Sequence, residues 1–126
     1  MKTILSFLMV LMVSCIQVQA QQTTSVNQAT KLIADQSELQ ILDVRSSGEY
    51  GAGHLAEAIL VTWGQKDFEK QALAKLTRDK PVLVYCRSGR RSTAASEALV
   101  KLGFGKVQNL EGGIIAWQKA GKPLVK

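Results

Sequence analysis

The feature that most constrains this chain is an apolar run that leads, through one short loop, into a helical run. Residues 81–85 (Pro-Val-Leu-Val-Tyr) have the continuous apolar character of a buried strand. Residues 92–102 have the composition of a helix that follows almost at once. Cys86 therefore stands where a buried strand ends and a loop leads into a helix.

Three features of this loop, residues 86–92, favour the thiolate form of Cys86 over the thiol. The backbone N–H groups of such a loop converge on one point, and the helix N-terminus adds partial positive charge. Arg87, Arg90 and Arg91 add positive charge of their own. Because the thiolate is the nucleophilic form of cysteine, the loop predicts a reactive thiol and a pocket for an anion. A cysteine that only fills space in the core would not need three arginines beside it.

The rest of the chain predicts strands that alternate with helices. Ser25 is a candidate N-cap, and Ser46 with Glu49 has the spacing of a capping box. Helices are expected at residues 26–34, 65–76, 92–102 and 114–120, and strands at 40–44, 58–61, 81–85 and 106–110. This order predicts an α/β fold of three layers, with a central, mainly parallel sheet and helices on both faces. Ligands of such sheets bind beyond the carboxyl ends of the strands, where Cys86 stands.

Residues 1–20 have the pattern of an export signal. Lys2 supplies the positive end, residues 4–13 form an apolar core too short to span a bilayer, and Ala20 is a small residue before a cut. We expect residues 1–20 to be a signal peptide, and residues 21–126 to be one exported, periplasmic domain. Residues 21–24 are expected to form a polar leader of that domain.

An alternative is attachment to a membrane through Cys15. The segment Met12-Val13-Ser14-Cys15 resembles a lipobox, although that motif prefers leucine where Met12 stands. Membrane association is expected only in that case. With either cut Cys86 is the only cysteine of the folded part, so no internal disulfide forms there and we expect a lone, exposed thiol.

The positive charge of the chain does not indicate nucleic-acid binding. The formal net charge is +6, but three of the positive charges lie in the Cys86 loop and the others are scattered. The sequence has no zinc-ligand spacing and no RNA-binding aromatic motif. We therefore expect neither a metal nor a nucleic-acid partner, and the sequence leaves the oligomeric state open.

Five segments, taken in order, resemble the single-domain rhodaneses over roughly residues 27–124. They are Leu42-Asp43-Val44-Arg45, Glu49-Tyr50, Gly53-His54-Leu55, Tyr85-Cys86-Arg87-Ser88-Gly89-Arg90-Arg91-Ser92, and Leu110-Glu111-Gly112-Gly113 with Trp117. The resemblance implies sulfur transfer. The Cys86 thiolate would take the outer sulfur of a small anionic donor such as thiosulfate, form a persulfide, and pass the sulfur to cyanide or a thiol. It implies no metal and no organic cofactor.

The resemblance also implies roles for individual residues. The backbone N–H groups of residues 87–91 would cradle the persulfide, and the substrate would contact Arg87, Ser88, Gly89, Arg90, Arg91 and Ser92. Asp43 would hydrogen-bond toward the loop, or serve the structure alone, and Arg45 would pair with Glu49. His54 is expected to support the fold instead of acting as a base. Trp117 is expected in the core, and Gly112-Gly113 in a turn.

A reactive cysteine in such a loop is also compatible with functions other than sulfur transfer. A persulfide carrier or a protein-docking module would keep Cys86 without rapid turnover, and an exposed thiol is also open to oxidation. A phosphatase or arsenate reductase is disfavoured, because such loops place an arginine six positions after the cysteine. Here the sixth position is Ser92, and a shorter loop suits sulfur. The chain departs from the family at Ala56-Glu57-Ala58 and Val61-Thr62-Trp63, near the rim of the expected site.

Overall fold

The computed structural model describes residues 21–126; the expected signal peptide and Cys15 lie outside the described residues. Its sheet has five strands in the order β1-β5-β4-β2-β3, and all four pairs of neighbours are parallel. The strands are β1 (Gln22–Thr24), β2 (Gln40–Asp43), β3 (Ile59–Leu60), β4 (Val82–Tyr85) and β5 (Val107–Leu110). The helices are α1 (Val26–Asp35), α2 (Ser47–Ala52), α3 (Phe68–Lys75), α4 (Arg90–Lys101) and α5 (Gly113–Lys119). Within this part of the chain no helix is both long and apolar enough to cross a membrane.

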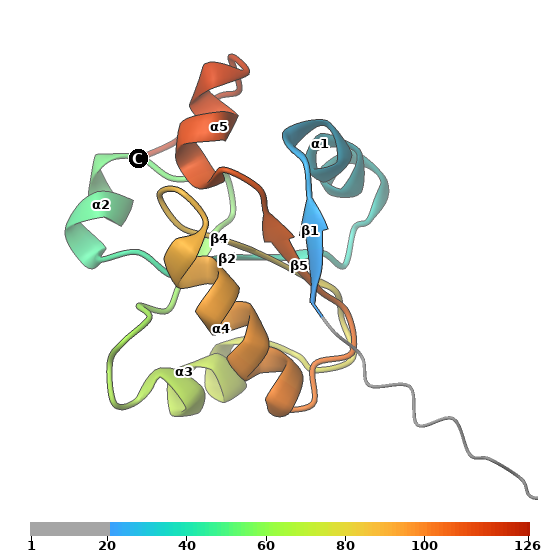
Figure 1. The fold of residues 1–126 in the computed structure, drawn as a ribbon, viewed down its shortest axis with the longest axis vertical. Coiled ribbons are helices and arrows are strands. Elements are labelled where there is room, and N and C mark those ends of the chain that lie inside the picture. Colours follow the sequence, from blue (N-terminus) through green and yellow to red (C-terminus); the bar gives the residue numbers. More distant parts are fainter. Residues whose placement is uncertain (1–20) are drawn as a thin grey trace, which may run out of the picture.

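Helices cover both faces of the sheet, as Figure 1 shows, with α1 and α5 on one face and α3 and α4 on the other. Each face has its own apolar cluster, because successive residues of a strand point to opposite faces. Val82 and Val84 belong to the cluster under α3 and α4, whereas Leu83 and Tyr85 belong to the cluster under α1 and α5. The predicted three-layer α/β fold is confirmed. Cys86 continues the alternation and packs on the α4 side.

Local capping explains why several helices begin where they do. Ser25 and Gln28 exchange both bonds of a capping box at the start of α1, with N···O distances of 3.2 and 3.0 Å. Ser46 and Glu49 form the same arrangement at the start of α2. Helix α4 begins at Arg90, two residues earlier than expected, because the left-handed backbone of Gly89 (φ 112°) ends the loop there.

The expectation that residues 21–24 form a polar leader is wrong. Residues 22–24 are strand β1, which pairs in parallel with residues 108–110 of β5 at one edge of the sheet. The Thr24 hydroxyl donates to the Gln108 side chain at 2.8 Å, and the Gln21 amide donates to the carbonyl of Thr93 at 3.2 Å. Residues 22–24 are all polar and show no apolar periodicity, so the sequence gives no local signal for a strand there. The strand forms through its pairing with β5.

The departure at Ala56-Glu57-Ala58 coincides with a strained backbone position. Glu57 has a φ of 66°, and it is the only non-glycine residue among residues 21–126 with a positive φ. A side chain in the left-handed region costs about 1–2 kcal/mol. The turn into β3 therefore keeps a conformation that suits glycine, although glutamate stands there.

Candidate active site

The Cys86 thiol lies at the carboxyl end of β4, inside the loop that leads into α4. The Gly89 N–H donates to Sγ at 3.1 Å, and the Ser92 hydroxyl lies 3.3 Å from the same atom. The side chain of Cys86 is only 1% exposed, so the expectation of an exposed thiol is wrong. Among the described residues it is the one free cysteine. It packs in the apolar cluster on the α4 side, while two polar donors of the loop contact its Sγ.

The Ser92 hydroxyl can change its partner when the thiol loses its proton. Its Oγ lies 3.0 Å from the carbonyl oxygen of Gly89 as well as 3.3 Å from Sγ, and one hydroxyl proton serves only one of them at a time. When the hydroxyl turns to the thiolate, the Gly89 carbonyl keeps the Thr93 N–H at 3.0 Å and the Thr93 hydroxyl at 2.7 Å. No acceptor is left unpaired, so the thiolate gains a donor at little cost.

The surroundings of Cys86 lower the pKa of its thiol. Burial alone raises the pKa, because it disfavours the charged thiolate. The hydrogen bonds of Ser92, first through its hydroxyl and then through its backbone, and those of the Gly89 and Ser88 backbones outweigh burial. The net pKa of Cys86 therefore lies below the ordinary thiol value, as the loop sequence predicted.

Replacing Ser92 with alanine is expected to raise the pKa of Cys86. The rate of any reaction of the thiolate rises with pH through this pKa, so the midpoint of the pH–rate profile should move to higher pH. Loss of one hydrogen bond to a charged group corresponds to a shift of roughly one to two pH units. The measurement is the pH dependence of Cys86 alkylation by iodoacetamide, followed by intact mass.

Ser96 provides a matched control for that variant on the same helix. Its hydroxyl is fully buried, and it has no hydrogen-bond partner among the described residues. Ser96→Ala removes the same atom one turn further along α4. Because this hydroxyl does not contact Sγ, the midpoint of the pH–rate profile should equal that of the parent protein. Equal midpoints for the two variants would show that the Ser92 hydroxyl does not set the thiol pKa.

The three loop arginines have different surroundings. Arg91 forms a bidentate ion pair with Glu49, with N···O distances of 2.7 and 2.9 Å. The hydrogen bond from Arg91 is the main reason that the pKa of Glu49 falls to about 2, so this carboxylate stays ionised at neutral pH. The side chains of Arg87 and Arg90 are exposed, and neither forms an ion pair with a residue in the described range.

The expected pairing of Arg45 with Glu49 is wrong, because Arg45 pairs with Asp43. Their shortest N···O distance is 2.7 Å, and both side chains are buried. The Tyr85 hydroxyl donates to the same carboxylate at 2.6 Å and accepts the Leu55 N–H at 3.1 Å. Arg45 Nη2 also donates to the carbonyl of Gly53 at 2.7 Å. This network joins the ends of β2 and β4 to residues 53–55, so Asp43 acts on the residue before Cys86 and not on the loop itself.

His54 also takes part in the structure. Its ring stacks on Tyr50, with centroids 3.7 Å apart, and its Nδ1 lies 2.8 Å from the Tyr50 carbonyl oxygen, to which a protonated Nδ1 donates. Its backbone pairs with Val125, with N···O distances of 2.9 and 2.8 Å, which fastens the C-terminal segment to residues 53–55. None of these contacts reaches Cys86.

Sequence reasoning missed the contact between Gly113 and the Cys86 loop. A Cβ atom at Gly113 would lie 2.5 Å from the carbonyl oxygens of both Cys86 and Arg87. The first turn of α5 packs this closely because the Ile114 and Ile115 N–H groups donate to those two carbonyls, at 2.9 and 3.2 Å. Gly113 therefore does more than form a turn, because it lets α5 approach the backbone of the Cys86 loop. The sequence signal for this close approach was a pair of glycines directly before a predicted helix.

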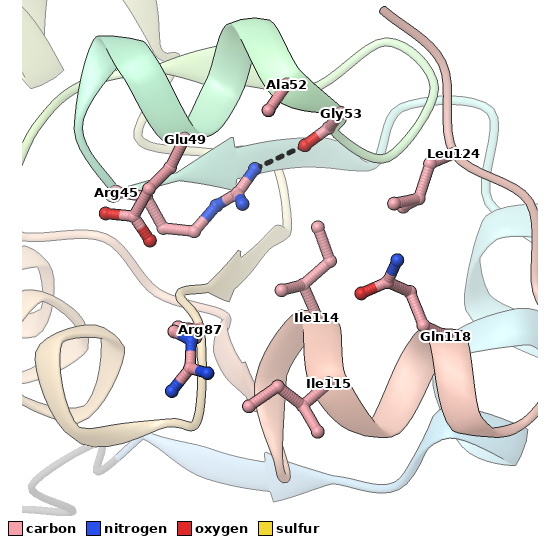
Figure 2. A pocket seen from close by; sticks show the side chains of 9 residues that line it. All are labelled: Arg45, Glu49, Ala52, Gly53, Arg87, Ile114, Ile115, Gln118 and Leu124. Atoms are coloured by element: carbon pink, nitrogen blue, oxygen red, sulfur yellow. Dashed lines mark hydrogen bonds between the residues drawn. The ribbon is translucent and has the colours of Figure 1, made fainter.

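A pocket of about 300 Å³ lies beside the loop, between α2, α5 and the C-terminal segment. In Figure 2, Arg87 lies toward one end of it and Leu124 toward the other. Its lining residues are Arg45, Glu49, Ala52, Gly53, Arg87, Ile114, Ile115, Gln118 and Leu124. Across residues 21–126 no three His, Cys, Asp or Glu side chains are grouped so that they would hold a metal ion.

Comparisons with known proteins agree with this geometry. A family model described as a rhodanese-like domain matches residues 25–120. The chain is similar to a sulfurtransferase from Allochromatium vinosum, with 34% identity over 93 residues, which are 74% of this chain and 84% of that protein. It is also similar to thiosulfate sulfurtransferase 18 from Arabidopsis thaliana, with 35% identity over 106 residues, covering 75% of this chain and 76% of that protein.

Two solved structures show the same architecture. A rhodanese-related protein from Thermoplasma volcanium has a TM-score of 0.70 and 32% identity, covering 82% of this chain and 97% of that chain. The polysulfide-sulfur transferase homodimer from Wolinella succinogenes has a TM-score of 0.69 and 26% identity, covering 86% of this chain and 81% of that chain.

Proposed function

Given that this chain belongs to the rhodanese-like family of sulfurtransferases, we propose that Cys86 carries a sulfane sulfur from an anionic donor to a thiol or to cyanide. The observation that carries the proposal is the setting of Sγ, which lies inside the loop and contacts the Gly89 N–H and the Ser92 hydroxyl. Two exposed arginines of the same loop, Arg87 and Arg90, have no ion-pair partner within residues 21–126. Thiosulfate is the first donor to test, because one similar protein is named a thiosulfate sulfurtransferase. Polysulfide is the second, because a similar structure is named for it.

The reaction divides into two displacements at sulfur. The Cys86 thiolate attacks the outer sulfur of thiosulfate, a new S–S bond forms, and sulfite leaves with the electron pair of the broken bond. An acceptor then attacks the outer sulfur of the persulfide, and Cys86 leaves as a thiolate. The Gly89 and Ser92 donors stabilise that thiolate in both steps, and Arg87 and Arg90 attract the anionic donor.

A persulfide carrier is the second candidate function, and the burial of Cys86 favours it. A sulfur atom that is only 1% exposed exchanges slowly with bulky partners. A carrier would accumulate a stable Cys86 persulfide and turn over slowly with every acceptor. The enzyme would discharge the same persulfide rapidly.

Intact mass spectrometry of the purified protein tests the proposal. After incubation with thiosulfate we expect the mass of one added sulfur, located on Cys86 by peptide mapping, and its loss after cyanide. A reduced Cys86 that gains no sulfur from thiosulfate or from polysulfide would contradict the proposal. A persulfide that forms but survives cyanide and thiols would favour the carrier.

We also propose that this reaction takes place outside the cytoplasm. The support is the export-signal pattern of residues 1–20, and attachment through a lipidated Cys15 is the alternative. In an oxidising compartment a buried thiol is better protected than an exposed one, which suits a lone reactive cysteine.

A further inference from the structure

We propose that Thr93 and Asn109 are positioning residues that leave the Ser92 hydroxyl free to serve Cys86. Both act through the carbonyl of Gly89 and not on the sulfur itself. Their role in catalysis rests on the proposed sulfur transfer, in both steps of which Cys86 is a thiolate. Two features of the structure support this role: a carbonyl oxygen with more donors than it can use, and a buried amide in an otherwise apolar layer.

Three donors contact the carbonyl oxygen of Gly89. They are the Ser92 hydroxyl at 3.0 Å, the Thr93 hydroxyl at 2.7 Å and the Thr93 N–H at 3.0 Å. A carbonyl oxygen has two lone pairs, so Thr93 alone fills both of them. The shorter of the two hydroxyl contacts also belongs to Thr93. The Ser92 proton is therefore surplus at Gly89 and available to the Cys86 Sγ, which lies 3.3 Å from the Ser92 oxygen.

Asn109 sets the direction of the Thr93 hydroxyl. Its Nδ2 donates to Thr93 Oγ1 at 2.9 Å. An amide nitrogen only donates, so this bond uses a lone pair of the hydroxyl and leaves its one proton for the Gly89 carbonyl. Thr93 is an exposed residue of α4, and without this partner its hydroxyl would be free to turn to water.

Asn109 is a polar residue at a position that the sheet makes apolar. It lies opposite Val84 in the register of β4 and β5, two residues after Val107, so it faces the layer under α4. Both valines belong to the apolar cluster of that layer. Asn109 is only 6% exposed, and its Oδ1 has no hydrogen-bond partner among residues 21–126. A buried, half-paired amide costs stability, so its bond to Thr93 is the contact that an apolar residue would not supply.

The charges around Cys86 stay the same when these uncharged residues are replaced. Arg91 is the charged residue whose electrostatic interaction with Cys86 is resolved, and it remains paired with Glu49. A shift in the pKa of Cys86 would therefore report on hydrogen bonding. The charged and titratable groups around the loop are Arg87, Arg90 and Arg91 of the loop and α4, Glu49 of α2, Asp43 of β2 with Arg45 after it, and Tyr85 of β4.

Thr93→Val tests this role through the pH dependence of Cys86 alkylation. Valine keeps the branched shape but has no hydroxyl, so the Gly89 carbonyl competes with Sγ for the Ser92 proton. The midpoint of alkylation by iodoacetamide, followed by intact mass, should rise by roughly half to one pH unit. Thr93→Ser keeps the hydroxyl and should restore the parent midpoint. Asn109→Val should raise the midpoint by less, because the Thr93 hydroxyl remains but loses its fixed direction.

Two variants match these changes away from the loop. Thr30→Val removes a hydroxyl that donates to the carbonyl four residues earlier, at 2.8 Å, as Thr93 does, but on α1. Gln108→Val removes the polar neighbour of Asn109 on β5, whose partner is the Thr24 hydroxyl. Both variants should keep the midpoint of the parent protein.

The Ser92→Ala background separates a role through Ser92 from a general disturbance of α4. Without the Ser92 hydroxyl there is no proton for Thr93 to release, so Thr93→Val should shift the midpoint no further. An equal shift in the parent and in the Ser92→Ala background would overturn the inference. A Thr93→Val protein with the parent midpoint, or a Thr30→Val protein with the same shift as Thr93→Val, would overturn it as well.

Alkylation needs only the thiol, so these midpoints do not depend on sulfur transfer. If neither thiosulfate nor polysulfide adds sulfur to Cys86, the proposed function fails, and the midpoints still decide whether Thr93 positions the Ser92 hydroxyl. If the persulfide forms, cyanide should discharge it roughly two- to fivefold more slowly from Thr93→Val than from the parent, because Cys86 leaves as a thiolate that has lost a donor. Equal discharge rates in the two proteins would overturn the role of Thr93 in catalysis.

Discussion

Cys86→Ser is expected to abolish sulfur transfer while the fold remains intact. A serine hydroxyl stays protonated at neutral pH and is a poor leaving group, so neither displacement at sulfur proceeds. Loss of a covalent nucleophile should lower thiosulfate:cyanide turnover by at least about a thousandfold. The measurement is thiocyanate production, together with the intact mass after thiosulfate, which should show no added sulfur.

The fold should tolerate this change because the polar partners of Sγ also suit oxygen. The Gly89 N–H and the Ser92 hydroxyl remain available as partners for the new hydroxyl, so no buried donor is left unpaired. The free energy of unfolding should change by no more than about 1 kcal/mol, measured by urea denaturation. A stable Cys86→Ser variant that still makes thiocyanate at a tenth of the parent rate would rule out Cys86 as the sulfur carrier.

The elements that were predicted well are those with a local signal. The caps at Ser25 and Ser46 are formed within four residues, so the sequence alone located the N-cap of α1 and the capping box with which α2 begins. The continuous apolar character of β4 follows from burial on both faces of a parallel sheet. This apolar run, with the helical run that follows it, was enough to place Cys86 at the end of a strand.

The contacts that were missed depend on residues far apart in the chain. Strand β1 forms only because residues 22–24 pair with β5, more than eighty residues later. Arg45 and Glu49 have favourable spacing for an ion pair, but Arg45 turns inward to Asp43, and Glu49 reaches Arg91, 42 residues away. Sequence spacing does not show which way a side chain turns.

The burial of Cys86 could have been read from the sequence. Val82 and Val84 point to the α4 side of the sheet, so a residue two positions further on continues into the same cluster. The expectation of an exposed thiol rests instead on the lack of a disulfide partner and on the three arginines of the loop. A charged loop and a buried thiol are compatible, because the Cys86 side chain points into the cluster under α4 while the side chains of Arg87 and Arg90 are exposed.

Gly113→Ala is expected to destabilise the protein and to slow sulfur transfer. The new Cβ would lie 2.5 Å from the carbonyl oxygens of Cys86 and Arg87, and the residue would keep a φ of 58°. Relief of this contact requires α5 to move away from the Cys86 loop, because backbone atoms cannot rotate aside as a side chain does. We expect a loss of roughly 2–4 kcal/mol in the free energy of unfolding, and a sulfur-transfer rate reduced by ten- to a hundredfold through displacement of Cys86.

Gly121→Ala separates the steric contact from the backbone strain. Gly121 has a similar φ of 75°, but an added Cβ there meets no atom within 4 Å. This variant should lose only about 1 kcal/mol, the cost of an alanine in the left-handed region, and its sulfur-transfer rate should match that of the parent. Urea denaturation and the rate of persulfide formation measure both quantities. If the two variants lose the same stability and keep the same rate, then the packing of α5 against the carbonyls of Cys86 and Arg87 does not position the thiol.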